Sequence, residues 1–224
     1  MSACCHCRCR KVRQLDPIRF SFSILYLFRS STVNDSRYVG EGWAICDIIT
    51  DIKEVSMAKG KKKKMKVYLE STISGYATAR PTSDERAAAM QTKTLQWVER
   101  WMKKCDCYVS KYVVDENLKG DKEAAKRRIE FDRKAKMIEV DDSLVVELAK
   151  RFISPDAIPS SQFTDALHVA VATVYGMDVL LTWNCTHINN PITLPVVYSE
   201  IARAGYKPPK ILDARQFMEA YDEH

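Results

Sequence analysis

The stretch "SQFTDALHVAVATVYGMDVLLT", residues 161–182, decides the fold. Beyond Leu167 it is apolar on nearly every side of a helix, so a helix over 161–175 has to be buried. Gly176 can end that helix. The continuous apolar run at 178–182 is typical of a strand in the interior of a parallel sheet. A buried helix that leads into a buried strand predicts an α/β protein.

Strand and helix patterns alternate through the residues before this stretch. Apolar runs at 66–69, 107–109 and 137–140 are typical of short strands. Capping residues, acidic first turns and apolar spacing indicate helices between them. The predicted helices run from Ser83 to about Lys104, from Ser110 to Gly120, from Asp121 onward and from Asp142 to Ile153. The apolar face of the last of these comprises Leu144, Val145, Leu148, Ala149 and Phe152.

This alternation predicts an α/β fold in which a single domain has a central parallel sheet. The tail, which includes "LPVVYSEIARAGYKPPKILDARQFMEAYDEH" at 194–224, is expected to add a strand, a short segment and a final helix. We expect the domain to span residues 65–224.

The basic charge of the chain is confined to its amino-terminal part. Of the 224 residues, with formal net charge +6, residues 1–64 hold 13 Lys and Arg against 6 Asp and Glu, whereas 65–224 hold 22 against 23. The run "KGKKKK" at 59–64 is either a solvated linker or an arm that binds phosphates. We expect residues 1–64 to be a disordered extension, either a leader or the product of a misassigned start.

Cysteine usage and hydropathy indicate a cytoplasmic protein. Four of the eight cysteines crowd into residues 4–9 without the paired spacing of a zinc module, and the others are scattered. This usage is typical of a reduced compartment. No apolar run approaches the roughly 18–20 residues of a membrane-spanning helix. The apolar stretch at 20–28 lacks the cleavage pattern of a signal peptide.

Polar residues close two of the predicted strands. Glu70 follows the first strand, and Asn184 follows the strand of the opening stretch. The carboxyl ends of parallel strands form the rim of the sheet where ligands gather. Asp165 adds a carboxylate nearby. If its helix begins near residue 160, the acid is buried and needs a partner; if the helix begins at Thr164, it is an ordinary first-turn acid.

Two further residues have ordinary interpretations when each is taken alone. Glu116 lies beside Tyr112 and Val113 on its helix and would pass for a surface glutamate. His168 follows Asp165 by one turn, and a core histidine satisfied by a neighbour is favoured over a ligand or base.

The set of polar residues changes this interpretation for Glu116. Glu70, Glu116, Asp165 and the amide of Asn184 would form an oxygen-rich site suited to Mg²⁺ or Mn²⁺. A cation held there activates water and polarises a phosphate oxygen, which is the chemistry of phosphodiester hydrolysis. The sequence therefore predicts a metal site whose chemistry suits phosphodiester hydrolysis.

Four segments resemble the PIN-domain family, specifically the VapC-like ribonucleases of bacterial toxin–antitoxin systems. They are "KVYLESTISGY" at 66–76, "VSKYVVDENLKGD" at 109–121, "IPSSQFTDALHVAVATVYGMDVLLTWNCTHI" at 158–188 and "AGYKPPKI" at 204–211. The resemblance covers roughly residues 65–217 in the order and spacing of the family. It implies a central parallel sheet flanked by helices on both faces, and Mg²⁺- or Mn²⁺-dependent cleavage of RNA.

Carried over by position, the resemblance implies roles for seven residues. Glu70, Glu116 and Asp165 would hold one or two metal ions, and Asn184 would hold a water or a second ion. The hydroxyls of Ser71, Thr72 and Thr182 would orient a water or a ligating carboxylate.

The chain departs from the family at two of these positions. Most members have aspartate at Glu70, and many have an acid at Asn184. The longer Glu70 side chain moves its carboxylate outward, and the loss of charge at Asn184 would weaken a second metal position.

Two functions are consistent with this pattern. The first is a ribonuclease toxin restrained by an antitoxin protein, with an RNA substrate and a homodimeric assembly of the kind common in the family. The alternative is a catalytically degraded PIN module that binds RNA or a protein partner. Stabilisation by metal would distinguish them.

Overall fold

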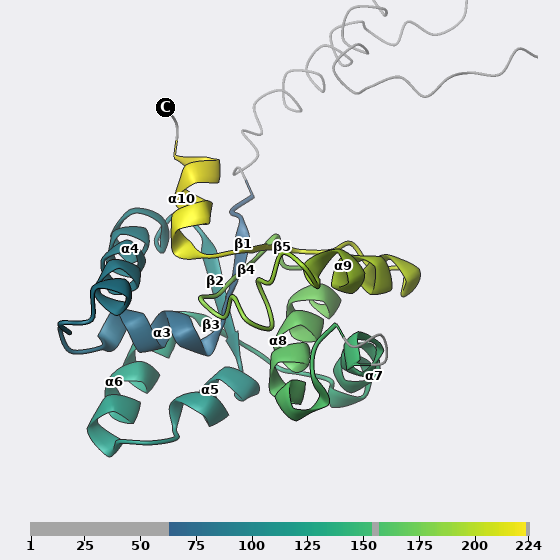
Figure 1. Cartoon of the computed structure of the whole chain (residues 1–224), viewed down its shortest axis with the longest axis horizontal. Helices are drawn as coiled ribbons and strands as arrows, with labels where there is room; N and C mark the ends of the chain where they lie inside the picture. Colours follow the sequence, from purple (N-terminus) through teal and green to yellow (C-terminus); the bar gives the residue numbers. More distant parts are fainter. Residues whose placement is uncertain (1–62, 154–156, 223–224) are drawn as a thin grey trace, which may run out of the picture. The chain divides into compact units, whose positions relative to one another are not determined.

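The computed structural model of the chain describes residues 63–153 and 157–222 (Figure 1). The extension predicted at 1–64 lies outside these residues except for its last two positions. Five strands form one sheet in the order β3-β2-β1-β4-β5, and each neighbouring pair is parallel. The strands are β1 (Lys66–Leu69), β2 (Asp106–Ser110), β3 (Lys136–Ile138), β4 (Val179–Leu181) and β5 (Lys210–Leu212).

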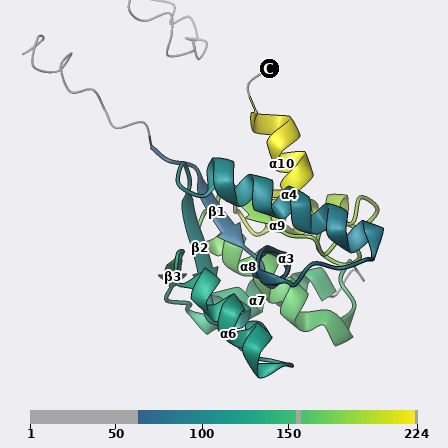
Figure 2. The same cartoon turned by 90° about the vertical axis from the view of Figure 1, so that its left-hand side faces the viewer.

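Helices flank the sheet, which confirms the predicted fold class. α4 and α10 pack together on one side of the strands, and α7 and α8 pack together on the other (Figure 1, Figure 2). The helices are α3 (Ser71–Thr78), α4 (Glu85–Trp101), α5 (Lys111–Asn117), α6 (Lys122–Asp132), α7 (Asp142–Ile153), α8 (Phe163–Val174), α9 (Leu194–Arg203) and α10 (Ala214–Tyr221). Among these helices, none is both long enough and apolar enough to cross a membrane.

The opening stretch folds as the sequence predicts. Every residue of α8 from Asp165 to Thr173 is buried, and so is every residue of β4. Gly176 follows the helix with a φ of 61°, a conformation that glycine adopts without a Cβ clash. The helix packs on its neighbour α7 and on the sheet, so its nearly continuous apolar surface has partners on several sides.

β1 lies at the centre of the sheet. It pairs with β2 on one side and with β4 on the other, and Val67, Tyr68 and Leu69 are buried. Leu69 is in register with Leu181. The residues that follow these two strands therefore emerge at the same edge, where the sequence predicts the site.

Several predicted details are wrong at the element boundaries. Asp84, and not Ser83, caps α4, because its carboxylate accepts the backbone N–H of Ala87 at 2.6 Å. The strand expected at the start of the tail is the helix α9, with Pro195 in its first turn, where proline is tolerated. Leu144, assigned to the buried face of α7, is 46% exposed.

Candidate metal centre

Glu70 ends β1 and begins α3. Its backbone N–H donates to the carbonyl of Leu181 at 3.1 Å, which continues the pairing with β4. Its carboxylate accepts the backbone N–H of Thr72 at 3.2 Å and thereby caps α3. The residues that follow β1 therefore form a helix and not a loop. A side chain that the sequence places at a strand end is held in place by the first turn of the following helix.

Three hydroxyl groups surround the buried Glu70 carboxylate. Ser71 donates to Oε1 at 2.6 Å, Thr72 donates to Oε2 at 2.5 Å, and Thr182 donates to Oε2 at 2.7 Å. These are the three hydroxyl residues singled out in the sequence. Oε2 is crowded by three donors, whereas Oε1 accepts one hydrogen bond and keeps a lone pair for a cation.

Glu116 and His168 complete a cluster with Glu70. Glu116 extends from α5 with 24% of its side chain exposed, and its Oε2 lies 3.0 Å from Nε2 of the fully buried His168. A carboxylate can only accept, so the imidazole donates. One candidate ligand atom from each of the three residues lies within 4.8 Å of the others.

Charge pairing offsets burial in this cluster. Burial disfavours the imidazolium form of His168, but the hydrogen bond to Glu116 and the charges of the nearby acids outweigh it and raise its pKa. Burial also disfavours ionised Glu116, but the hydrogen bond and charge of His168 lower its pKa. The pair therefore favours an imidazolium beside a carboxylate, which reduces the repulsion between Glu116 and Glu70.

Asp165 and Asn184 form a second group with His187. Oδ2 of Asp165 lies 3.0 Å from Nδ1 of His187, and Oδ1 of Asn184 accepts the backbone N–H of His187 at 3.0 Å. Burial raises the pKa of Asp165, while its hydrogen bond with Asn184 lowers it and the charge of Glu70 adds to the rise. Asp165 therefore lies close enough to Glu70 for their charges to interact, although it is outside the 4.8 Å cluster.

The structure resolves the two alternatives for Asp165. A 3₁₀ turn at Ser160–Gln162 precedes α8, so the α-helix begins at Phe163 and Asp165 lies in its first turn. The acid is nevertheless buried. It combines the favourable dipole position with the need for partners, which are His187 and Asn184.

The donor set is compatible with a divalent cation. Glu70 retains a lone pair on Oε1, and Glu116 uses Oε2 for His168, which leaves its Oε1. Carboxylate oxygens suit Mg²⁺ and Mn²⁺. The cluster could therefore hold one such ion.

Two histidines contribute to the site beyond the residues chosen from the sequence. His168 is a core histidine satisfied by a neighbour, as the sequence favours, but the neighbour is Glu116. The one-turn spacing from Asp165 was the available signal. His187 had no comparable signal, because its contact with Asp165 depends on the turn after β4.

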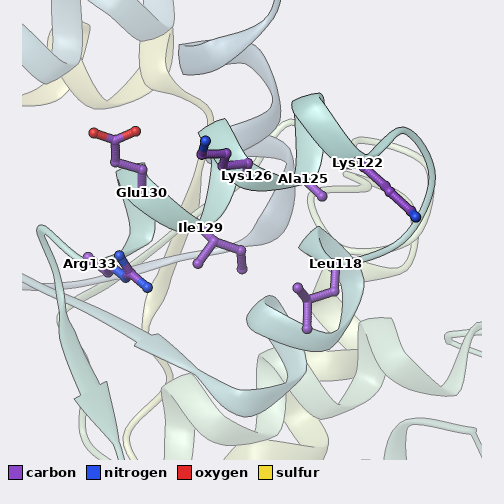
Figure 3. Close-up of a pocket in the computed structure, with 7 residues that line it drawn as sticks. All are labelled: Leu118, Lys122, Ala125, Lys126, Ile129, Glu130 and Arg133. Carbon is purple, nitrogen blue, oxygen red and sulfur yellow. The ribbon is translucent and has the colours of Figure 1, made fainter.

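A groove of about 620 Å³ lies apart from these residues, between α5 and α6 (Figure 3). Leu118, Ala125 and Ile129 provide its apolar surface. Its basic side chains are Lys122, Lys126 and Arg133. The predicted metal ligands do not line this groove, so the candidate metal centre is a separate feature.

Comparisons with known proteins give limited similarity. The sequence matches no protein-family model and no curated protein. The structure of VapBC2 from Rickettsia felis bound to a DNA fragment from their promoter is 13% identical, with a TM-score of 0.42, and the match covers 66% of this chain and 98% of that chain. Tyrosyl-tRNA synthetase from Archaeoglobus fulgidus, complexed with L-tyrosine, is 14% identical, with a TM-score of 0.36 and coverage of 72% and 58%. Neither likeness is strong enough to argue for function.

Proposed function

We propose that the chain is a divalent-metal-dependent ribonuclease of the PIN type. The observation that carries the proposal is the convergence of Glu70 and Glu116 within 4.8 Å at the carboxyl edge of a parallel sheet. Two carboxylates that lie close together in a partly buried site repel one another, so they need a cation or a charged hydrogen-bond donor beside them. Ligands gather at this edge in open parallel sheets.

In this proposal, Glu70, Glu116 and Asp165 hold Mg²⁺ or Mn²⁺, and Asn184 holds a water. When bound, the ion supplies the polarisation of a phosphodiester and the lowered pKa of a water molecule. Ser71, Thr72 and Thr182 keep the Glu70 carboxylate in one orientation. Glu70 then needs no rearrangement of its own side chain to receive the ion.

The partners follow from the resemblance to VapC-like proteins and from the chemistry of the site. We infer an RNA substrate, an antitoxin protein that restrains cleavage, a homodimeric assembly and a cytoplasmic location. An antitoxin segment would cover the metal centre or the surface beside it.

The test is cleavage of RNA by the purified full chain with Mg²⁺ or Mn²⁺, with EDTA as the metal-free control. We expect the wild type to cleave RNA. We expect Asp165→Asn and Glu116→Gln each to lower the cleavage rate by roughly tenfold to hundredfold or more, as changes at a metal site do. Equal low cleavage by the wild type and both variants would contradict the proposal.

One observation favours the alternative, a catalytically degraded PIN module that binds RNA or a protein. Four hydrogen bonds from the chain itself already reach the Glu70 carboxylate. An acid satisfied in this way can serve as a helix cap without any metal. A protein that binds RNA, but gains no stability from Mg²⁺ or Mn²⁺, would be of this second kind.

A further inference from the structure

A continuous chain of hydrogen bonds runs from the sheet to the Glu116 carboxylate. The Ser110 Oγ lies 2.7 Å from the Tyr68 hydroxyl, which lies 2.9 Å from Nδ1 of His168. Nε2 of His168 completes the chain at 3.0 Å from Oε2 of Glu116. The four residues come from β2, β1, α8 and α5, so the chain connects four separate elements.

The inner three members of this chain are fully buried. Ser110, Tyr68 and His168 each have 0% exposure. A buried polar group is costly to leave without a partner, so each member holds its neighbour in place. Aromatic contacts restrict the imidazole further: its ring centroid lies 5.9 Å from that of Tyr68 and 6.5 Å from that of Tyr112.

Glu116 fixes the direction of the last hydrogen bond in the chain. Its carboxylate only accepts, so Nε2 of His168 carries the proton. If the imidazole is neutral, the Tyr68 hydroxyl donates to Nδ1 and Ser110 donates to Tyr68. If it is charged, Nδ1 donates to Tyr68, which donates to Ser110. Either arrangement satisfies every member and leaves the bond to Glu116 unchanged.

Ser110 makes its hydrogen bond with Tyr68 and does not cap α5. It occupies the N-cap position of α5, as the sequence predicts, but its hydroxyl makes no capping hydrogen bond. Serine at this position usually accepts a backbone N–H of the first turn, and the loss of such a cap destabilises a helix. Ser110 instead forms its hydrogen bond with the buried Tyr68. Such departures from local sequence preference are expected at functional sites.

We propose that His168 is a positioning residue that fixes the Glu116 carboxylate for cation binding, with Tyr68 and Ser110 fixing the imidazole. The inference rests on the proposed function, because it assigns Glu116 as a metal ligand. Without His168, a partly exposed glutamate on a helix of only seven residues has several rotamers and reaches Glu70 in only some of them.

The test compares Mn²⁺ affinity among full-length variants, measured as free Mn²⁺ by electron paramagnetic resonance. Glutamine places its amide nitrogen near the position of the imidazole Nε2, whereas asparagine is too short to reach Glu116. We expect His168→Asn to weaken Mn²⁺ binding by about 10–100-fold, as losses of orienting partners do. We expect His168→Gln to restore most of the affinity.

Tyr68→Phe tests the inner part of the chain without altering the imidazole. We expect it to weaken Mn²⁺ binding less than His168→Asn does, while the matched Tyr108→Phe on β2, outside the chain, leaves the affinity unchanged. Thermal unfolding of each variant identifies any loss that comes from misfolding. Folded His168→Asn and Tyr68→Phe proteins with wild-type Mn²⁺ affinity would overturn the inference.

Two further results separate this inference from its alternatives. Electron spin echo modulation from a nitrogen bound directly to Mn²⁺, lost in His168→Gln, would make His168 a ligand and overturn its positioning role. For RNA, we expect His168→Asn to lower kcat with KM unchanged.

Metal binding and RNA cleavage together separate this inference from the proposed function. If Mn²⁺ binding depends on His168 but the protein cleaves no RNA, the positioning role is supported and the ribonuclease function is contradicted. If the protein cleaves RNA and His168→Asn changes neither cleavage nor Mn²⁺ affinity, the ribonuclease function is supported and the positioning role is contradicted. A wild type that binds no Mn²⁺ would overturn both.

Discussion

The Thr182 hydroxyl donates a 2.7 Å hydrogen bond to the Glu70 carboxylate, and this bond joins residues 112 positions apart in the chain. The two residues follow adjacent strands, β1 and β4. The orientation of the first candidate ligand therefore depends on the pairing of these strands as much as on its own helix cap.

Removal of this hydroxyl should destabilise the protein. In Thr182→Val, the buried Glu70 carboxylate loses one donor, and the backbone N–H of Asn184 loses its acceptor. We expect a loss of about 1–3 kcal/mol in the free energy of unfolding, measured by urea denaturation. The exposed Thr186→Val is the control and should change little. Equal effects of the two substitutions would contradict this account of Glu70.

Glu70→Asp should uncouple the carboxylate from Thr182. A shorter aspartate can still cap α3 through the Thr72 N–H, since aspartate is a favoured cap, but it is one methylene further from β4. Once the bond is lost, Thr182→Val should cost less in the Glu70→Asp background than in the wild type. A double-mutant cycle on unfolding free energies measures this coupling, which we expect to be about 0.5–3 kcal/mol. Additive effects would show that the two side chains do not interact in the wild type or that the shorter carboxylate still reaches Thr182, and either result would contradict the prediction.

Metal should stabilise the folded protein if the centre binds it. Mn²⁺ at 100 times its dissociation constant is expected to add about 2.7 kcal/mol to the free energy of unfolding. Glu116→Gln should remove most of this increment because it removes one of the two converging carboxylates. Denaturant titrations with Mn²⁺ and with EDTA provide the comparison, and an increment retained in full by the variant would place the ion elsewhere.

Asp132 should make stability depend on pH. It accepts a hydrogen bond from Asn117 at 2.7 Å, and burial raises its pKa from the ordinary 3.8 to about 6. Between these values the folded protein binds the proton more tightly than the unfolded chain, so stability falls as pH rises and is constant above about pH 6. The fall attributable to this group is on the order of 2–3 kcal/mol.

Asp132→Asn removes this titration. The free energy of unfolding of the wild type, relative to the variant, should be higher at pH 4 than at pH 7. The exposed Asp115→Asn removes the same charge without burial and is the matched control. Parallel pH profiles for the wild type and Asp132→Asn would contradict the prediction.

Apolar periodicity correctly predicted the helices and strands whose apolar residues are buried in the core. The helix predicted at 142–153 has those bounds in the structure, and the buried helix and strand of the opening stretch are both present. The sequence prediction was wrong at 194–203, where two β-branched valines favour a strand but form part of α9. Packing against α7 outweighs the weak intrinsic preference of these residues.

The candidate site was predictable in its acids and less so in their partners. Glu70 and Asn184 could be placed at one edge because parallel strands end together. The link between Glu116 and His168 could not be inferred, since the two residues are 52 positions apart and meet only through the packing of α5 and α8. The same holds for His187 and Asp165, which meet only because the turn after β4 folds back over α8.

The place of β1 between β2 and β4 has a consequence for synthesis of the chain. β1 and β2 can pair early, but the other edge of β1 has no partner until residues 179–181 have left the ribosome. Unpaired strand edges promote association with other chains. The innermost strand of the finished protein is therefore an exposed edge in the nascent one. A chain cut short before β4 would keep this edge unpaired and would lack Thr182, Asn184 and a complete candidate metal centre.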